Sequence, residues 1–290
     1  MVNKQGLSKV AVVIGATSKW QADGSNTKHA HERVLSVDDM PMGIRWGVGG
    51  AIAQKFASEG YFVVLTTRLR KNASDLQAAI EQQGGKCMIV ELDVGDTESV
   101  SGAFRTVRET VGDPEVVVYN AGSMLGRDLP AELELLENLP VEIFDAVHHI
   151  AARGPFLVAK EALPAMRRAG AGTFLFTNNP MSLRGRKRNT GESLYYPRVM
   201  ARALSQVLTE EYSRYGVHIA TVIIDGYIDS PGTRALVNYK GSKPMPSANR
   251  PGVLLDPMKI AETYYYLHMQ DRSCWTHEIQ LTPFDQLPAN

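Results

Sequence analysis

A glycine-rich turn that is split in two constrains the fold of this chain more than any other feature. Residues 10–14 form an apolar run that ends in Gly15-Ala16-Thr17-Ser18, and the matching half, Gly47-Val48-Gly49-Gly50, comes 29 positions after Ser18 and opens an alanine-rich helical pattern. A buried strand that leads through glycines into a helix is typical of a cradle for a dinucleotide diphosphate, because the backbone approaches closely and the helix N–H groups favour the charge. Such a turn needs only about three residues between its first two glycines. The sequence therefore predicts an insertion over residues 19–46.

A second apolar strand, residues 61–67, follows the helix that the glycines open. The unit thus reads strand, turn, helix, strand, as a dinucleotide site requires. The second strand ends in Thr67-Arg68, with Arg70 and Lys71 close behind, where an acidic residue would bind a free ribose 2′-hydroxyl. Cations at this position suit a 2′-phosphate, so NADP(H) is favoured over NAD(H). The alternative is a solvated charge run that opens a loop.

Composition excludes several classes of protein. The 290 residues carry 31 basic and 31 acidic side chains, so no electrostatic argument favours nucleic acid or an anionic membrane as partner. No apolar run approaches the roughly 18–20 residues of a membrane span, and the first residues lack the apolar core of a signal peptide. Cys87 and Cys274 lie far apart, and His29 and His31 lack further ligands at metal-binding spacing. We expect a cytoplasmic protein with a small-molecule substrate and no metal site.

Apolar segments alternate with helical patterns along the rest of the chain, which predicts a parallel sheet covered on both faces. We therefore expect one α/β domain over residues 1–290, a Rossmann-type doubly wound parallel sheet of about seven strands. Thr97 is the expected N-cap of one helix, and residues 139–168 read as a long helix with a break near Gly154-Pro155. The other expected strands are 86–92, 115–119, 172–177, 217–224 and 277–281, and the other expected helices are 73–84, 197–216 and 256–270.

Ligands of such sheets bind beyond the carboxyl ends of the strands. The residues expected on that rim are Gly15, Thr67, Asp93, Asn120, Thr177 and Asp225.

With these landmarks in place, the chain resembles the short-chain dehydrogenase/reductase (SDR) family along nearly its whole length. The resemblance rests on the Gly15/Gly47/Gly49 turn, Asp93-Val94, Asn120-Ala121-Gly122, the strand entry Gly216-Val217-His218-Ile219, and Asp225-Gly226-Tyr227-Ile228-Asp229-Ser230-Pro231, which stands where the family has Pro-Gly-x-x-x-Thr-Pro. It implies that Asp93 contacts the adenine, that Asn120 stiffens the sheet rim, and that Ile228 and Ser230 hold the nicotinamide carboxamide. The cofactor-binding residues expected in this way are Gly15, Thr17, Ser18, Gly47, Val48, Gly49, Thr67, Arg68, Asp93, Val94, Asn120, Ala121, Gly122, Arg198, Asp225, Gly226, Ile228 and Ser230.

The resemblance also places the family's catalytic set of Asn, Ser and Tyr-x-x-x-Lys. In such a pair the two side chains are neighbours on a helix, and the ammonium lowers the pKa of the phenol. Counting back from Gly216 puts the family lysine on Arg198 and its tyrosine on Leu194, with Tyr195 and Tyr196 directly after it. Taking Tyr196 as the phenol instead would put Met200 at the lysine position. The family serine corresponds to Asn179 and its asparagine to Ala151, so all four positions depart from the pattern.

Several groups could replace the missing ones. Arg198 keeps the cation but cannot release a proton, and Asn179 can donate a hydrogen bond but is neither acid nor base. Tyr195 or Tyr196 could supply a phenol, or could be packing aromatics at a helix entrance. His148 and His149 lie near the Ala151 position and could titrate near neutral pH, or be ordinary helix histidines.

These residues leave three functions open. The first is an NADP(H)-dependent oxidoreductase that transfers a hydride to or from a small carbonyl or alcohol, with Tyr195 or Tyr196, Arg198 and Asn179 in the active site. The second is a non-redox lyase, isomerase or dehalogenase, and the third is an NADP-binding protein without catalysis. The insertion over residues 19–46 is expected to cover the cofactor or substrate or to be an oligomer contact, and residues 232–256 match the family's substrate lid. The resemblance further implies a homodimer or homotetramer.

Overall fold

The computed structural model describes residues 9–17, 41–122, 136–184, 196–236 and 252–289. Seven strands form one sheet in the order β3-β2-β1-β4-β5-β6-β7, and every pairing is parallel. The chain order reverses between β1 and β4, which is where doubly wound sheets bind their ligands. The strands are β1 (Val10–Ile14), β2 (Phe62–Thr67), β3 (Lys86–Glu91), β4 (Val116–Tyr119), β5 (Gly172–Asn178), β6 (Val217–Ile224) and β7 (Glu278–Leu281).

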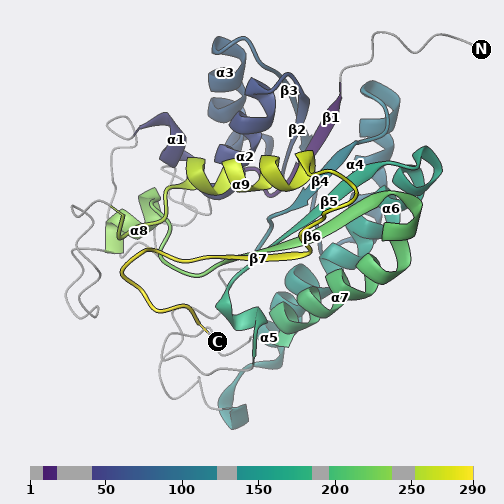
Figure 1. The fold of residues 1–290 in the computed structure, drawn as a ribbon. Coiled ribbons are helices and arrows are strands. Elements are labelled where there is room, and N and C mark those ends of the chain that lie inside the picture. The colour runs from purple at the N-terminus through teal and green to yellow at the C-terminus, as the bar shows by residue number, and fades with distance from the viewer. Residues whose placement is uncertain (1–8, 18–40, 123–135, 185–195, 237–251, 290) are drawn as a thin grey trace, which may run out of the picture.

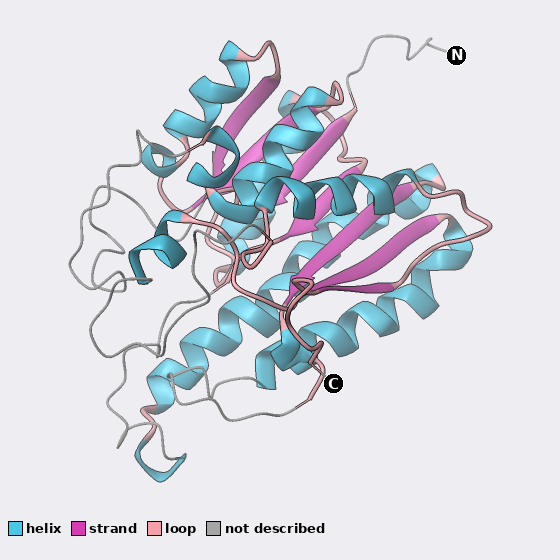
Figure 2. Ribbon diagram, turned by 60° about the vertical axis from the view of Figure 1, so that its left-hand side comes forward, coloured by secondary structure: helices cyan, strands magenta, loops and turns pink. Residues whose placement is uncertain are grey.

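Helices cover both faces of the sheet (Figures 1 and 2). One hydrophobic core lies under α2 (Gly47–Ser58), α3 (Ser74–Gln82) and α9 (Pro257–Met269), and is centred on Phe56, Leu76 and Tyr264. The second lies under α4 (Thr97–Thr110), α6 (Gly154–Ala169) and α7 (Tyr196–Tyr212), with Phe104, Leu163 and Phe174 at its centre. All residues of β1, β4 and β6 are buried. This two-sided burial explains why their sequences are apolar without alternation.

Short elements complete the chain between these layers. They are α1 (Met42–Arg45), α5 (Val141–His148), α8 (Pro231–Leu236), the π-helix η5 (His149–Arg153), and the 3-10 turns η2 (Arg70–Asn72), η4 (Leu136–Asn138), η6 (Pro180–Ser182) and η7 (Ser213–Tyr215).

The predicted fold class is confirmed, and two local predictions need correction. The N-cap of α4 is Asp96, one residue before the predicted Thr97, because the Asp96 carboxylate accepts the Glu98 N–H at 3.2 Å. The predicted long helix over residues 139–168 is three consecutive segments, α5, η5 and α6. Its irregularity is the π-helix that precedes Gly154, not a break at Gly154-Pro155.

Candidate functional site

The two halves of the split glycine turn meet at the carboxyl end of β1. Gly15 has φ 81° and Gly47 has φ 64°, conformations that side chains other than glycine rarely adopt. A Cβ on Gly49 would overlap the carbonyl oxygen of Gly15 and lie 2.8 Å from the amide nitrogen of Asn120. The Asn120 side chain itself donates to the Gly15 carbonyl at 2.9 Å. The insertion therefore leaves the predicted turn geometry intact.

Helix α2 points its N-terminus at this turn. Its N-cap is Trp46, which offers no side-chain hydrogen bond to the helix, and the first turn of α2 carries no acidic residue. The first N–H groups of an α-helix have no partners inside the helix and, together with the helix dipole, favour an anion. Gly47, Val48 and Gly49 thus lie where a diphosphate would need them. Thr17 is half-buried beside the turn, whereas Ser18 falls outside the described residues.

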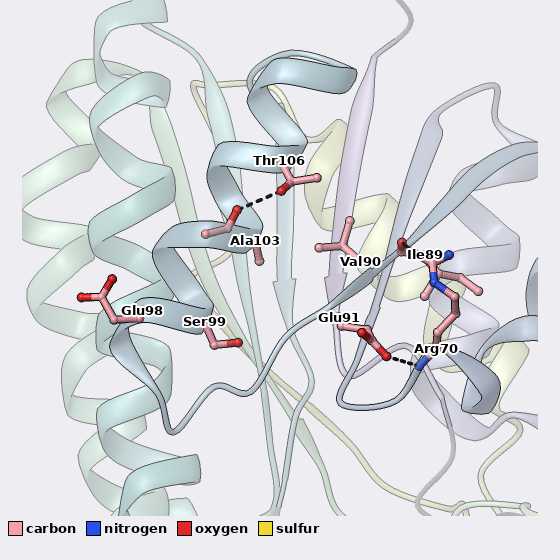
Figure 3. Close-up of a pocket in the computed structure, with 9 residues that line it drawn as sticks. Arg70, Ile89, Val90, Glu91, Glu98, Ser99, Ala103 and Thr106 are labelled. Atoms are coloured by element: carbon pink, nitrogen blue, oxygen red, sulfur yellow. Dashed lines mark hydrogen bonds between the residues drawn. The ribbon is translucent and has the colours of Figure 1, made fainter.

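The end of β2 is followed directly by an exposed cation, Arg68. Thr67 is buried and its hydroxyl donates to the carbonyl of Leu69 at 3.3 Å, while Arg68 is exposed. Arg70 turns instead to edge strand β3, where its N–H meets the Glu91 carboxylate at 2.8 Å and its guanidinium meets the Ile89 carbonyl at 3.0 Å. Figure 3 shows Arg70 and Glu91 on one wall of a pocket, and helix α4 forms the other wall. Of the predicted cations here, Arg68 is the one that directly follows the strand on the nucleotide rim.

The loop after β3 is fixed by hydrogen bonds to its own residues and to η5. Asp93 is exposed, with one carboxylate oxygen accepting the Gly95 N–H at 2.9 Å, and Val94 packs into the core. The Arg153 guanidinium donates to the Gly95 carbonyl at 2.6 Å and to the Thr97 hydroxyl at 2.7 Å. This clamp ties the predicted adenine-side loop to the π-helix.

The loop after β4 lies against the glycine turn. The Asn120 backbone N–H continues the sheet by donating to the Ile14 carbonyl at 2.9 Å. A Cβ on Gly15 would come within 2.9 Å of Ala121. Asn120, Ala121 and Gly122 are all half-buried. Sequence analysis placed Gly15 and Asn120 on the same rim, and the structure joins their loops, which are 105 positions apart, because both follow neighbouring strands at the switch point.

Tyr119, which sequence analysis did not single out, connects β4 to the π-helix. Its hydroxyl donates to the Ile150 carbonyl inside η5, and burial raises the pKa of this phenol far above its usual value. A Cβ on Gly154 would overlap the same hydroxyl, which explains glycine at that position. π-Helices frequently occur at functional sites, and η5 contains the buried Ala151. One sequence feature could have indicated this role. The strand reads Val-Val-Val and then ends in a tyrosine, an aromatic residue with a polar hydroxyl group.

His148 and His149 each contact a residue that lies one helical turn earlier in α5. The Nδ1 atom of His149 lies 2.7 Å from the Asp145 carbonyl, four residues earlier. His148 lies beside Phe144 with ring centroids 5.7 Å apart.

Arg198 and Asn179, which the resemblance places at the family's lysine and serine positions, lie close to the end of β5. The Arg198 guanidinium donates to the Thr177 carbonyl at 3.2 Å, which joins the first turn of α7 to the strand end. One oxygen of Asn179 accepts the Met181 N–H at 3.0 Å and caps η6. The next residue inward, Asn178, is 2% exposed, and neither atom of its amide has a hydrogen-bond partner among the described residues. Tyr195 lies outside the described residues, and Tyr196 is described only as the first residue of α7.

The loop after β6 carries the predicted nicotinamide-side residues. Ile228 pairs with Leu255 in an isolated parallel bridge. The hydroxyl of Ser230 accepts the Thr233 N–H at 3.2 Å at the start of α8. Asp225 is 1% exposed, and its carboxylate accepts hydrogen bonds from Gln280 in β7 and from the segment that follows this strand. The side chain of Asp225 thus serves that segment, while Gly226, Ile228 and Ser230 follow it along the rim.

The fold therefore brings the predicted rim residues together from six strands. Among the described residues, no group of three or more His, Cys, Asp or Glu side chains could hold one metal ion, and no helix could cross a membrane. His29 and His31 lie outside the described residues. This rim is therefore a candidate dinucleotide groove, in which the glycine turn and the helix N-terminus would hold the diphosphate. Arg68 and Asp93 would lie toward the adenosine end, and Arg198 and Ile228 toward the other.

Comparisons with known proteins agree with this class. The model of the family described as enoyl-(acyl carrier protein) reductase matches residues 43–280. The 3-oxoacyl-[acyl-carrier-protein] reductase MabA of Mycobacterium tuberculosis is 31% identical over 229 residues, 78% of this chain and 83% of MabA. The oxidoreductase YxbG of Bacillus subtilis is 26% identical over 244 residues, 81% of this chain and 85% of that protein.

A solved structure extends the match along the chain. The alcohol dehydrogenase of the archaeon Thermococcus sibiricus, in complex with 5-hydroxy-NADP, superposes with a TM-score of 0.69 at 26% identity, covering 97% of this chain and 98% of the archaeal one. This chain belongs to the short-chain dehydrogenase/reductase family.

Proposed function

We propose that the protein is an NADP(H)-dependent oxidoreductase that transfers a hydride to or from a small carbonyl or alcohol. The observation that carries the proposal is the reassembled glycine turn, in which Gly49 approaches Gly15 so closely that a Cβ does not fit. The glycine turn of a diphosphate cradle needs such close packing of the helix start against the end of the strand. The relatives that share the family are oxidoreductases by name.

Arg68 supports NADP(H) as the cofactor. It is the exposed cation directly after β2, where a 2′-phosphate would lie, and no acidic residue follows β2 to bind a free 2′-hydroxyl. The archaeal relative is described in complex with a hydroxylated NADP. We expect NADPH to bind more tightly than NADH, and Arg68→Asp to reverse the order. Equal affinity of the parent for both nucleotides would contradict this assignment.

The residues at the other end of the groove define the reaction. A bound nicotinamide would supply the hydride. Arg198, held at the end of β5 through the Thr177 carbonyl, would hold the nicotinamide ribose through its cation. Asn179 would donate a hydrogen bond from its amide nitrogen to the substrate oxygen. Tyr195 or Tyr196 would exchange a proton with that oxygen, because Arg198 cannot release one. Arg198 would lower the phenol pKa by charge, as the family lysine does.

The test mixes purified protein with NADPH and a panel of small aldehydes and ketones and follows the loss of NADPH absorbance. We expect turnover that falls at least about a hundredfold in Tyr195→Phe or in Tyr196→Phe, the range typical of lost acid–base catalysis. Turnover that survives in both variants and in their double mutant would rule out a tyrosine proton donor. Absence of turnover with every substrate would leave the second candidate.

The second candidate is an NADP-binding protein without catalysis. It is favoured by Asn179, whose oxygen already caps η6, and by the small Ala151 in η5 where the family has asparagine. Tight NADPH binding without turnover, unchanged in Arg198→Ala, would establish it. A non-redox dehalogenase is disfavoured because such relatives lose the glycine cradle that this chain keeps.

We also propose a homodimer or homotetramer built on α6 and α7. Phe156 on α6 and Val207 on α7 are large apolar side chains that are 49% and 59% exposed, and a contact with a second copy along these helices would remove apolar surface from water. Light scattering after size exclusion should give two or four copies for the parent and fewer for Phe156→Glu with Val207→Glu.

A further inference from the structure

A buried carboxylate binds the last described segment of the chain to the end of β6. Asp225 is 1% exposed, and its oxygens accept hydrogen bonds from the Gln280 amide at 2.7 Å and from the Ala289 N–H at 2.6 Å, with longer contacts of 3.4 Å from Thr282 and Gln286. All four donors are neutral. A buried charge is stable only when its lone pairs are hydrogen-bonded, so the segment 282–289 and Asp225 depend on each other.

Hydrogen bonds join Asp225, Gln280 and Ala289 in a closed ring at the carboxyl ends of the strands. The Gln280 amide donates to Asp225 and also to the Ala289 carbonyl, at 3.1 Å. In Figure 1 the yellow segment that follows β7 turns back and ends below that strand. Between its two attachment points, Pro283 is buried and packs so close to Gly226 that a Cβ there would lie 2.7 Å from the proline ring. The segment thus covers the residue that follows Asp225.

The same stretch of backbone carries the nicotinamide-side residues. Three residues after Asp225, Ile228 pairs with Leu255, and the Asp229 carboxylate forms a bidentate pair with Arg234 at 2.6 and 2.8 Å. These contacts hold the far part of the loop. At the near part, the Asp225 N–H donates to the Leu281 carbonyl and the Asp225 carbonyl accepts from Gln286. The position of Gly226 therefore depends on the segment 282–289.

We propose that Asp225 is a positioning residue, which acts through the segment 282–289 to set the loop Gly226–Ser230 against the nicotinamide half of the cofactor. The inference rests on the proposed function, which supplies the nicotinamide cofactor as the ligand of this loop. The family has a proline at this position, whose side chain cannot accept hydrogen bonds from a returning segment. Asp225 does not touch the cofactor. It fixes the backbone that does.

The experiment compares Asp225→Asn and Gln280→Ala with Asp113→Asn, a control that is exposed in the connection before β4, at the amino end of that strand. Hydrogen exchange of the unliganded proteins is followed in peptides covering residues 226–230 and 282–289. Binding is measured for NADPH and for adenosine 2′,5′-bisphosphate, which carries only the adenosine half.

In Asp225→Asn we expect exchange in both peptides to accelerate about tenfold or more, because charge-assisted hydrogen bonds are lost. The Kd of NADPH should rise about tenfold while that of the bisphosphate stays within about twofold. Gln280→Ala should show the same pattern more weakly.

Three results would overturn the proposal. The first is exchange in Asp225→Asn that matches the Asp113→Asn control. The second is faster exchange with unchanged NADPH affinity. The third is an equal loss of affinity for NADPH and for the bisphosphate, since that would indicate general loosening of the fold. If the parent binds neither ligand, the proposed function fails and the positioning role fails with it, while the exchange data still report whether Asp225 holds the segment.

Discussion

The carbonyl oxygen of Gly15 lies directly against the Cα atom of Gly49, although 33 residues separate the two in the sequence. The contact brings the end of β1 and the first turn of α2 together, and the Asn120 amide completes it by donating to the same oxygen. The side chain of Asn120, from the end of another strand, thus supports the approach. The proposed nucleotide groove depends on this approach more than on any single side chain.

Gly49→Ala should disrupt the turn. The added Cβ meets backbone, which cannot move aside, so we expect the free energy of unfolding to fall by about 1–3 kcal/mol or more and NADPH binding to be lost. Gly102→Ala is the matched control, because Gly102 lies inside α4 and the nearest atom to its Cβ would be the Arg105 guanidinium at 3.9 Å. This control should gain up to about 1 kcal/mol from helix propensity. Urea unfolding and nucleotide titration measure both effects, and equal stability of the two variants would refute the argument.

Arg198→Ala should weaken NADPH binding about tenfold, since a cation with a hydrogen-bonding role is lost. Arg202, one helical turn further along α7, provides the control. Its guanidinium is paired with Glu278 at 2.6 and 2.9 Å and lies outside the proposed groove. Calorimetric titration should therefore show Arg202→Ala within about twofold of the parent. Similar losses in both variants would point to damage of α7 instead of a lost contact.

Glu115 should make the protein less stable in acid. The hydrogen bond with His268 holds the pKa of Glu115 below its ordinary value of 4.5, with Lys9 adding a smaller effect. A carboxylate with a depressed pKa contributes stability at neutral pH, and this stability is lost as the pH falls below about 4.5. Because the side chain is 36% exposed, the contribution should stay below about 1 kcal/mol. Urea unfolding at pH 7 and pH 4 should show a smaller pH dependence in Glu115→Gln than in Glu109→Gln, an exposed control on α4.

His218 adds a second pH dependence at higher pH. Burial lowers the pKa of this histidine, which stacks on Trp275 with ring centroids 4.8 Å apart. As the pH falls below 6.5, the unfolded chain takes up a proton that the folded one resists, so stability decreases until the folded pKa is reached. His218→Phe keeps an aromatic ring and removes the titration. Its melting temperature should change less between pH 7.5 and 5.5 than that of the parent, and an identical slope would exclude His218 as the source.

The fold could be predicted from the sequence because its strands are buried on both faces. The run Val-Ala-Val-Val-Ile of β1 and the eight buried residues of β6 leave little choice of structure. The exact start of α4 could not be predicted, since Asp96 and Thr97 are both good capping residues. The split turn was predictable because each half kept its own local pattern. The hydrogen bond between Tyr119 of β4 and the π-helix η5 could not be predicted, because Tyr119 resembles one more apolar strand residue in the sequence.

The candidate site was predictable where one strand end determines a residue's place, as at Gly15 or Asn120. It was not predictable where the partner comes from irregular chain. Asp225 binds Gln280 and Ala289, which are 55 and 64 positions away, through a segment without periodicity. The burial of Asn178 could not be predicted either, because it depends on how α7 and η6 pack over the end of β5. The proton donor, Tyr195 or Tyr196, stays a prediction.

The attachment of residue 289 to Asp225 also orders events during synthesis. The two residues are 64 positions apart, and ribosomes add about 5–20 residues per second. Asp225 is therefore made about 3–13 seconds before the backbone N–H that binds its carboxylate. During that interval the carboxylate has to be satisfied by water or by other groups.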